Sequence, residues 1–478
     1  MKMAAVRKTK IVATLGPACR DVGTLERMIA AGMDVARINA SHASHDVIRE
    51  ELQALRQASQ RAGREVSAIL DLMGPKIRVG DIAGGEAYLA DGQDFTLTTL
   101  EDQGDASHAG VNYPELLAIL QPGDAVLLDD GALRLRVVTK AGTEVRCKVE
   151  AGGVLRSRKG INLPGVKLDV PALTAKDLSD LELGLELGTD WVALSFVRSP
   201  RDLMRLRDEI RERGSDTPII AKIEKQEAVK DLEAVVRAAD GVMVARGDLG
   251  VEMPLEEIPL LQKRIIEVAA SQGKPVITAT QMLQSMIEHP SPTRAEVSDV
   301  ANAVFDATDA VMLSGETAVG SYPVEAVETM QRVALKAETT LPYDRWLDER
   351  RRWISSSMVE AVCFAACELA RQTEATAIVA PTESGFTARQ MSRFRPRQPI
   401  LAPTPEKRVA RRLALFWGIY PRLVGVQGGI EKMFASSEDV ARKEGYLGPG
   451  NTVVVTAGLK DPSEEGVPTT NTIHCVTG

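Results

Sequence analysis

The chain has 478 residues, too many for one hydrophobic core, so its length predicts two or three domains. Hydrophobic residues make up 44% of it and charged residues 26%, the balance of an ordinary globular protein. Its formal net charge is −8, from 58 basic and 66 acidic side chains, so the charge does not favour nucleic acid or an anionic membrane as a partner. No apolar run approaches the roughly 20 residues needed to cross a bilayer.

The first residues and the cysteines predict a cytoplasmic location. The amino-terminal segment is basic, but Gly16 and Pro17 interrupt its apolar run too early for a signal peptide. The five cysteines are odd in number and scattered, at positions 19, 147, 363, 367 and 475. Cys363 and Cys367 lie at helical spacing on an alanine-rich stretch, which favours buried packing over metal ligation. We therefore expect a reducing compartment.

Short apolar runs alternate with amphipathic helical stretches through two parts of the chain. The runs are 11–14, 35–38, 67–70, 191–194, 219–223, 242–245, 276–279 and 310–313, with helices expected at, for example, 24–31, 46–62, 176–187 and 255–271. Eight strands alternating with helices is the count of a closed (β/α)₈ TIM barrel. We assign residues 1–74 and 170–344 to this barrel.

Polar side chains gather where these strands end. They are Arg37, Asn39, Ser41 and His42 after the second run, Asp71 after the third, Ser195 after the fourth, Lys222 and Glu224 at the fifth, Arg246 to Asp248 after the sixth, Thr278 and Thr280 at the seventh, and Ser314 and Glu316 after the eighth. The carboxyl ends of barrel strands open on one face, where ligands bind. One pocket could therefore collect all of these groups.

The fifth run is unusual because Lys222 stands inside it. A lysine between isoleucines is costly unless its ammonium reaches a partner or a ligand. Carboxylates at neighbouring strand ends could share a hard cation, which takes oxygen ligands and suits phosphate chemistry. The alternative is a structural ion pair between Lys222 and Glu224, and these residues alone do not decide between the two.

The alternation fails between residues 75 and 169, where short β runs and turns predict an inserted small β-barrel domain. The runs are 87–89, 95–97, 125–128, 133–138 and 145–149, with Asp91-Gly92 and Asp130-Gly131 as hairpin signals. The insert follows the third barrel strand at the ligand face, so it is placed to act as a lid. A passive insertion is the alternative.

Residues 345–478 predict a third, open α/β domain. Helices are expected at 358–371, 387–394 and 407–414, and strands at 377–380, 400–402, 422–426 and 452–456. The turn from Pro381 to Thr387 is rich in hydroxyls and enters a helix, which is a plausible phosphate cradle. Basic residues at 389–412 could hold a second anionic group, although a solvated or subunit-contact face explains them equally well.

No Walker A motif, dinucleotide-type glycine motif or zinc-type Cys/His array is present, so a nucleotide enzyme here must hold phosphates with metal ions and basic side chains. The blocks VARINASH and LDLMGPKIR bring cations and oxygen ligands together, but each alone is weak because Asn-x-Ser turns are common. AKIEK followed at this spacing by GVMVARGDLGVE is much more specific.

With these motifs the chain resembles the pyruvate kinase family over nearly its whole length. Further matching segments are RKTKIVATLGPAC, KGINLPG, ITATQML, PTRAEVSDVANAV, AVMLSGETA, TESGFTARQ and TNTIHCV. The resemblance implies phosphoryl transfer from phosphoenolpyruvate to ADP, giving pyruvate and ATP in the final step of glycolysis. It also implies Mg²⁺ or Mn²⁺ as cofactor and a homotetramer.

The resemblance also implies roles for individual residues. Lys222 would stabilise the phosphoryl group in flight, with Arg37 on another side of the phosphate. Glu224 and Asp248 would hold the divalent ion, and the amides of Gly247 and Asp248 would face the substrate carboxylate. Thr280 would lie near the carbon that takes a proton, orienting a water. The nucleotide positions would be Asn39, Ala40, Ser41, His42, Arg78 and Lys159.

One departure from the family concerns potassium. In many members the positions of Asn39, Ser41, Asp71 and the carbonyl of Leu72 bind K⁺, and a glutamate stands where this chain has Lys76. A lysine ammonium could supply the charge of potassium and repel the ion, so we expect activity without K⁺. A surface position for Lys76 is the alternative.

An effector and two rival functions complete these expectations. The turn hydroxyls Thr382, Ser384 and Thr387, with Gly385, could take a sugar phosphate or a nucleoside monophosphate, although Phe386 replaces a basic residue of many relatives. The rival functions are a Mg²⁺-dependent, enolate-forming TIM-barrel lyase and a non-catalytic sensor of a phosphorylated metabolite. A lyase would not need both Lys222 and Arg37 directed at a phosphoryl group.

Overall fold

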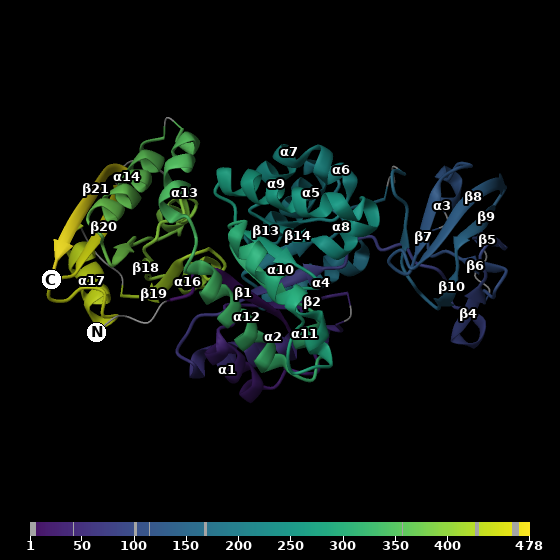
Figure 1. Ribbon diagram of the computed structural model, residues 1–478, viewed down its shortest axis with the longest axis horizontal. Helices are drawn as coiled ribbons and strands as arrows, with labels where there is room; N and C mark the ends of the chain where they lie inside the picture. The colour runs from purple at the N-terminus through teal and green to yellow at the C-terminus, as the bar shows by residue number, and fades with distance from the viewer. Residues whose placement is uncertain are drawn as a thin grey trace.

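The computed structural model describes residues 6–41, 43–99, 103–113, 115–166, 170–355, 357–425, 430–460 and 468–478. It consists of three bodies in a row, with a barrel in the centre, an all-β insert at one end and a C-terminal α/β domain at the other (Figure 1). Across these described ranges, every helix is too short or too polar to span a bilayer.

Eight parallel strands close the central barrel in the order β1-β16-β15-β14-β13-β12-β3-β2. They are β1 (Lys10–Thr14), β2 (Val35–Asn39), β3 (Ser67–Leu72), β12 (Trp191–Leu194), β13 (Ile219–Ile223), β14 (Gly241–Ala245), β15 (Val276–Ala279) and β16 (Ala310–Leu313). This confirms the barrel that the eight apolar runs predicted. The strands are apolar throughout because parallel strands in such folds are covered on both faces.

Helices surround the barrel and bury their apolar faces against the strands. The main ones are α1 (Val22–Ala31), α2 (His45–Arg61), α4 (Ala175–Glu186), α5 (Pro200–Glu212), α6 (Gln226–Lys230), α7 (Leu232–Ala238), α8 (Arg246–Glu252), α9 (Ile258–Ser271), α10 (Arg294–Phe305), α11 (Gly315–Ala318) and α12 (Pro323–Glu338). Capping boxes stabilise the first turns of two of these helices. Thr174 and Asp177 form the box at α4, and Thr293 and Glu296 form the box at α10.

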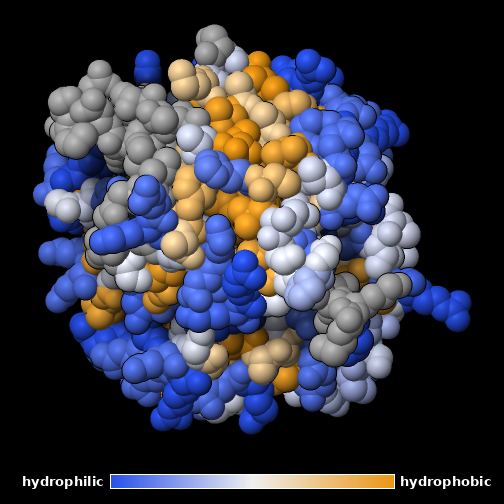
Figure 2. Space-filling model, turned by 90° about the vertical axis from the view of Figure 1, so that its left-hand side faces the viewer, coloured by the Kyte–Doolittle hydropathy of each residue, from blue (hydrophilic) through white to orange (hydrophobic). Residues whose placement is uncertain are grey.

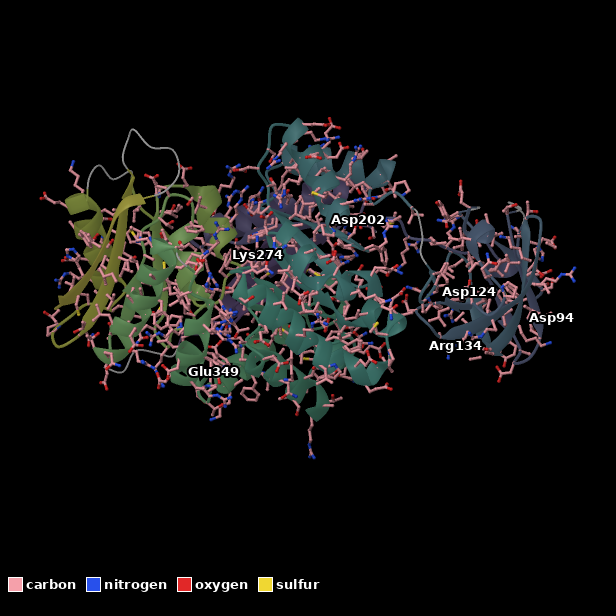
Figure 3. The ribbon with its side chains drawn as sticks, turned by 90° about the horizontal axis from the view of Figure 1, so that it is seen from above. Asp94, Asp124, Arg134, Asp202, Lys274 and Glu349 are labelled. Atoms are coloured by element: carbon pink, nitrogen blue, oxygen red, sulfur yellow. The ribbon has the colours of Figure 1, made fainter. Side chains whose placement is uncertain are left out.

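The insert between β3 and β12 projects from the barrel, and Figure 3 shows its Asp94, Asp124 and Arg134 far from Asp202 of the barrel. Its strands are β4 (Glu86–Leu89), β5 (Asp94–Thr98), β6 (His108–Gly110), β7 (Ala125–Leu128), β8 (Leu133–Ala141), β9 (Glu144–Ala151), β10 (Gly153–Arg156) and β11 (Ile161–Asn162), and it also contains the α-helix α3 (Glu115–Ile119). Six strands form a sheet ordered β11-β7-β8-β9-β5-β6, and β10 pairs with β4.

Only one of the two predicted hairpin signals is a hairpin. Asp130-Gly131 joins the antiparallel pair β7 and β8, and both residues have positive φ angles, as such a turn requires. Asp91-Gly92 is a turn, but β4 pairs with β10 and β5 pairs with β9, so the expectation of a hairpin there was wrong. The turn chemistry was read correctly, whereas the partner of each strand depends on contacts distant in sequence.

The C-terminal domain is a five-stranded sheet in the order β19-β18-β17-β20-β21. Its elements are α13 (Tyr343–Arg350), α14 (Met358–Gln372), β17 (Ala377–Val379), α15 (Phe386–Ser392), β18 (Ile400–Thr404), α16 (Lys407–Leu413), β19 (Ile419–Leu423), α17 (Ile430–Lys443), β20 (Thr452–Lys460) and β21 (Pro468–Thr477). The strand expected at 422–426 begins earlier, at Ile419, and residue 426 lies outside the described ranges. Helix α17 and strand β21 were missed.

Ion pairs join the C-terminal domain to the barrel. Arg395 contacts Asp309 at 2.8 Å, and both side chains are buried. On α16, Arg408 and Arg412 pair with Asp216. Residues Lys407 and Arg411 of the same helix pair with Glu65. The basic residues that could have held an anion therefore serve largely as an interdomain contact.

Candidate active site

Strand periodicity brings the predicted groups to the inside of the barrel mouth. Side chains alternate between the two faces of a strand, and the interior set includes Val12, Val35, Ile69, Ala193 and Ile220. Two positions further along the same strands, or just past their ends, come Thr14, Arg37, Asp71, Ser195 and Lys222, followed by Glu224. The same face of each strand is thus apolar inside the barrel and polar at its carboxyl end.

Lys222 is the centre of this group and is buried. Its Nζ donates to Ser195 Oγ at 2.7 Å, lies 2.9 Å from Glu224 Oε1 and lies 3.5 Å from Asp71 Oδ1. Burial alone would lower the pKa of Lys222, but the carboxylates of Asp71 and Glu224 outweigh it and raise the pKa above its ordinary value. The amine is therefore a permanent cation at neutral pH.

Arg37 and Asp71 form the second charged pair of the mouth. Arg37 Nε donates to Asp71 Oδ2 at 2.6 Å, and its Nη1 donates to Thr14 Oγ1 at 3.2 Å. Burial would raise the pKa of Asp71, but Lys222 and Arg37 together hold it below its ordinary value. Two cations thus converge on one carboxylate, which places two positive groups on this side of the mouth.

Glu224 and Asp248 are the acidic pair predicted to bind a metal. Glu224 Oε2 accepts the Phe196 amide at 2.7 Å, whereas Oε1 is buried beside Lys222 with no donor aligned for a hydrogen bond. Burial and the nearby Glu224 carboxylate raise the pKa of Asp248 to about 6. Two close carboxylates, one with an unfilled oxygen, fit a divalent cation that takes its remaining ligands from water or substrate.

The described residues hold no cluster of three or more His, Cys, Asp and Glu side chains that could bind a metal by themselves.

Thr280 is held in a strained loop beside the start of α8. Its φ angle is +72°, which is costly for a threonine. Its hydroxyl donates to the Ala279 carbonyl at 2.6 Å and accepts the Gly247 amide at 2.9 Å. The Gly247 amide, expected to face a substrate carboxylate, is here engaged by Thr280. It belongs, with that of Asp248, to the first turn of α8, where amides lack intrahelical acceptors.

The predicted nucleotide residues fall into two groups. Asn39 and Ser41 form a turn at the barrel mouth, with the Ser41 amide donating to Asn39 Oδ1 at 3.3 Å, and Ala40 is buried. His42 lies outside the described residues. Arg78 and Lys159 are on the insert. The Lys159 side chain pairs with Asp129 at 2.8 Å, and the backbone of Arg78 forms an antiparallel β-bridge with that of Gly160. The nucleotide set is thus divided between barrel and insert.

Lys76 faces a cleft between the insert and the barrel rather than open solvent. Lys76 and Asp130 from the insert line this cleft together with Asp248 from the barrel. Lys76 is among the cations that lower the pKa of Asp248, which agrees with its place on the wall of this cleft. Arg37 and Lys222 are the cations beside Asp71.

The predicted effector turn is held mainly by its own contacts. Thr382 Oγ1 accepts the Gly385 amide at 2.8 Å, and Ser384 Oγ accepts the Phe386 amide at 3.4 Å. Gly385 has a φ of +81°, and Thr387 lies in the short helix α15. The Thr387 carbonyl accepts the Cys363 thiol at 3.7 Å.

Sequence reasoning did not assign roles to two features of the mouth. Ser195 was noted as a strand-end residue, but its contact with Lys222 joins strands whose sequence positions are distant. Arg246 donates to the Thr280 carbonyl at 2.7 Å and pairs with Asp299 at 2.6 Å. Asp299 stands within a motif that the sequence offered, PTRAEVSDVANAV, but nothing in that motif names its partner.

Comparisons with known proteins agree with this architecture. Residues 6–327 match the family model "Pyruvate kinase, barrel domain", and residues 360–476 match "Pyruvate kinase, alpha/beta domain". The chain is 42% identical to a pyruvate kinase of Clostridium acetobutylicum over 95% of this chain and 96% of that one. It is 44% identical to a pyruvate kinase of Geobacillus stearothermophilus, over 95% of this chain and 78% of the other.

A solved structure is also similar. The crystal structure of a pyruvate kinase from Cryptosporidium parvum superposes with a TM-score of 0.92 and 37% identity, covering 98% of this chain and 96% of that one. Similarity of this extent, over barrel, insert and C-terminal domain together, favours phosphoryl transfer over the lyase and the sensor.

The chain is accordingly a phosphotransferase that moves a phosphoryl group from phosphoenolpyruvate to ADP, giving pyruvate and ATP. By family models, relatives and fold alike, the chain belongs to the pyruvate kinase family.

Proposed function

We propose that Lys222 stabilises the phosphoryl group during its transfer. The observation that carries this proposal is the position of Nζ, buried at the barrel mouth within 2.9 Å of Glu224 and near a second cation, Arg37. As the bond from phosphorus to the enol oxygen breaks and a bond to an ADP oxygen forms, charge spreads over the phosphoryl oxygens. Fixed cations in a buried site stabilise that charge without reorganisation.

Glu224 and Asp248 would hold Mg²⁺ or Mn²⁺. The support is the unfilled Oε1 of Glu224, together with the burial and the nearby Glu224 carboxylate that raise the pKa of Asp248 to about 6. Held by these two carboxylates, a divalent ion would supply positive charge that offsets the charge developing on the phosphoryl group. The same two carboxylates would bind Mn²⁺ with similar oxygen ligands.

Thr280 would orient the water that protonates the enolate carbon of pyruvate. Its own proton is directed at the Ala279 carbonyl, so the hydroxyl serves better as a fixed acceptor or orienting group than as an acid. Substrate binding would draw the Gly247 and Asp248 amides toward the substrate carboxylate, where the start of a helix favours an anion.

ADP would lie between the barrel turn at 39–42 and the insert residues Arg78 and Lys159. The insert would then close over the reaction as a lid, because its residues already form one wall of the cleft at Asp248. Closure would bring the insert's basic side chains to the nucleotide phosphates and exclude water from the transfer.

Activity would not require potassium. Three of the oxygens at positions that bind K⁺ in many relatives are already engaged, with Asp71 on Arg37, the Leu72 carbonyl on Ser195 and the Asn39 amide oxygen on the Ser41 amide. Lys76 adds a further positive charge on the insert side of the site. These cations repel a monovalent ion and replace its charge.

An apolar surface on the C-terminal domain supports self-association. Figure 2 looks onto the C-terminal domain and shows a contiguous apolar band on its face. In that domain α14 has an exposed Met358 and, at helical spacing, Ala361 and Ala365 open to solvent. A homotetramer that covers this band would remove it from water.

The five cysteines are all free thiols, which suits the reducing cytoplasm.

The C-terminal turn would take a phosphorylated effector, a sugar phosphate or a nucleoside monophosphate. Support comes from its hydroxyls, Thr382, Ser384 and Thr387, and from Gly385, whose φ of +81° suits glycine and shapes the turn before α15. Thermal shift with each ligand class, in wild type and in Thr382→Ala, tests the proposal. Equal shifts in both proteins would place the ligand elsewhere.

The test of the catalytic proposal couples ADP-dependent pyruvate formation to lactate dehydrogenase. Wild type should turn over with phosphoenolpyruvate, ADP and Mg²⁺ in a tetramethylammonium buffer. Lys222→Met should lose turnover while it still binds Mn²⁺ and phosphoenolpyruvate, because its role is in the transition state. Full turnover of that variant would refute the role of Lys222.

A further inference from the structure

The turn after β12, formed by Ser195 and Phe196, contacts both the lysine and the metal-binding glutamate of the site. Ser195 follows Leu194 at the carboxyl end of the strand, and its hydroxyl is buried between β3 and β13. The hydroxyl lies 2.7 Å from Lys222 Nζ and 2.8 Å from the Leu72 carbonyl. The turn therefore connects three neighbouring strands at the barrel mouth.

The proton of the Ser195 hydroxyl has one good acceptor. A serine carries one O–H donor and two lone pairs. The Leu72 carbonyl is 2.8 Å away, whereas Asp71 Oδ1 is 3.4 Å away, so the proton goes to the carbonyl. The oxygen is then left to accept from Lys222. Its lone pair sets the direction of one N–H of the ammonium.

This contact limits where the remaining N–H groups of Lys222 point. An ammonium has three donors. One donates to Ser195 at 2.7 Å. Among the described residues, Glu224 Oε1 lies 2.9 Å from Nζ without an aligned hydrogen bond, and Asp71 Oδ1 lies 3.5 Å away, too far for a good one. With Ser195 fixing one N–H, the other two are left for a phosphoryl oxygen.

Phe196 positions the other half of the site. Its φ angle is +55°, a left-handed conformation that costs free energy in a non-glycine residue. In this conformation its amide donates to Glu224 Oε2 at 2.7 Å, which leaves Oε1 toward Lys222. The same turn packs on Gly74, where an added Cβ would lie 3.0 Å from the Ser195 carbonyl oxygen.

We propose that Ser195 is a positioning residue that aims the Lys222 ammonium at the transferring phosphoryl group. The inference rests on the proposed transition-state role of Lys222. It assigns to Ser195 the direction of the Lys222 ammonium, because the Ser195 hydroxyl is the group that accepts a hydrogen bond from Nζ, at 2.7 Å. A small error in direction is costly because the transfer depends on alignment of charge with the moving group.

The experiment compares Ser195→Ala with Ser195→Thr, which keeps the hydroxyl. Ser195→Ala should lower kcat by about 10- to 100-fold, with the KM for phosphoenolpyruvate within about threefold of wild type. Ser195→Thr should recover most of that loss. Mn²⁺ affinity, followed by electron paramagnetic resonance, should stay within about twofold in both, because Glu224 is still held by the Phe196 amide.

Ser392→Ala is the matched control for a purely structural effect. Ser392 is equally buried in the C-terminal domain, and its hydroxyl donates to the Trp417 carbonyl at 2.7 Å. It should lose thermal stability comparable to Ser195→Ala and keep the wild-type kcat. If Ser195→Ala does not fold, Ser195→Cys replaces it, because a thiol is a weak acceptor and should show the same loss of kcat.

The outcomes separate the two proposals. Turnover of Ser195→Ala within threefold of wild type, or a rise in KM with kcat unchanged, would overturn the positioning role. If Lys222→Met is inactive while Ser195→Ala is fully active, only the positioning role fails. If Lys222→Met retains turnover, the proposed function of Lys222 fails and the role of Ser195 with it.

Discussion

Replacement of Lys222 by methionine tests the charge at the centre of the site. The substitution keeps the length and most of the volume of the side chain but removes an ammonium that lies 2.9 Å from Glu224 and 3.5 Å from Asp71. A single hydrogen-bond donor aimed at transition-state charge is worth about 10²–10³ in kcat, or roughly 2.7–4 kcal/mol. Lys222 carries a full charge in a buried position, so we expect a loss of about 10³-fold or more.

The cost to folding should be smaller than that to catalysis. Removal of one partner from a buried ion pair typically costs about 3–5 kcal/mol, because the other charge is stranded. Here Arg37 remains on Asp71 at 2.6 Å and the Phe196 amide remains on Glu224 at 2.7 Å. The variant should therefore fold and bind Mn²⁺ with little change in affinity.

The assay couples pyruvate formation to lactate dehydrogenase, with Mn²⁺ and phosphoenolpyruvate binding measured by calorimetry. Lys10→Met is a matched control, because Lys10 is also buried in a barrel strand but contacts the Ile419 carbonyl of the C-terminal domain instead of the site. It should keep the wild-type kcat. A kcat for Lys222→Met within tenfold of wild type, with both ligands bound, would refute the reasoning.

Three further predictions concern charge elsewhere in the chain. Lys76→Glu should make turnover dependent on K⁺, measured by titrating KCl into a tetramethylammonium buffer. Equal turnover of this variant with and without K⁺ would contradict the prediction. Arg395→Met should strand Asp309 in the interface and lower the melting temperature by more than about 5 °C without changing kcat, in calorimetry. Burial lowers the pKa of Lys10 to about 7, so protonation in the folded state is disfavoured. Buried Lys10 therefore destabilises the fold fully below pH 7, and this destabilisation fades as the pH rises toward 10.5. The melting temperature of Lys10→Met should exceed that of wild type at low pH, and the difference should shrink between pH 7 and 10.5. A difference in melting temperature that stays constant from pH 7 to 10.5 would count against this prediction.

The barrel was predictable because its information is local. Each strand is a short run of apolar residues and each helix repeats its apolar residues at helical spacing, so the eight pairs can be counted without knowing any long-range contact. Val35, Ile69 and Ile220 point into the barrel. Because side chains alternate along a strand, Arg37, Asp71 and Lys222, two residues later, point to the same side at the barrel mouth. Sequence alone could thus gather the charged groups.

Pairing across the chain was decided only by the tertiary structure. Nothing near Asp91-Gly92 indicates that β4 pairs with β10. Strand β19 begins at Ile419, where it pairs with Ile400 of β18, and the amide of the preceding Gly418 donates to the distant Lys8 carbonyl at 2.9 Å. Likewise the basic residues of α16 bind Asp216 and Glu65 of the barrel, partners that no local pattern names. Such contacts depend on loop closure over long distances.

The amino-acid sequence by itself determined the barrel, the insert at its ligand face and the chemical types of the groups at the mouth, because all three follow from periodicity and order along the chain. The tertiary structure decided how those groups share protons and charge. Ser195 accepts from Lys222 only because β12 and β13 are neighbours with this register, and Lys76 faces Asp248 only because the insert folds back on the barrel. Hydrogen-bond direction depends on positions known to tenths of an ångström, which a linear pattern does not contain.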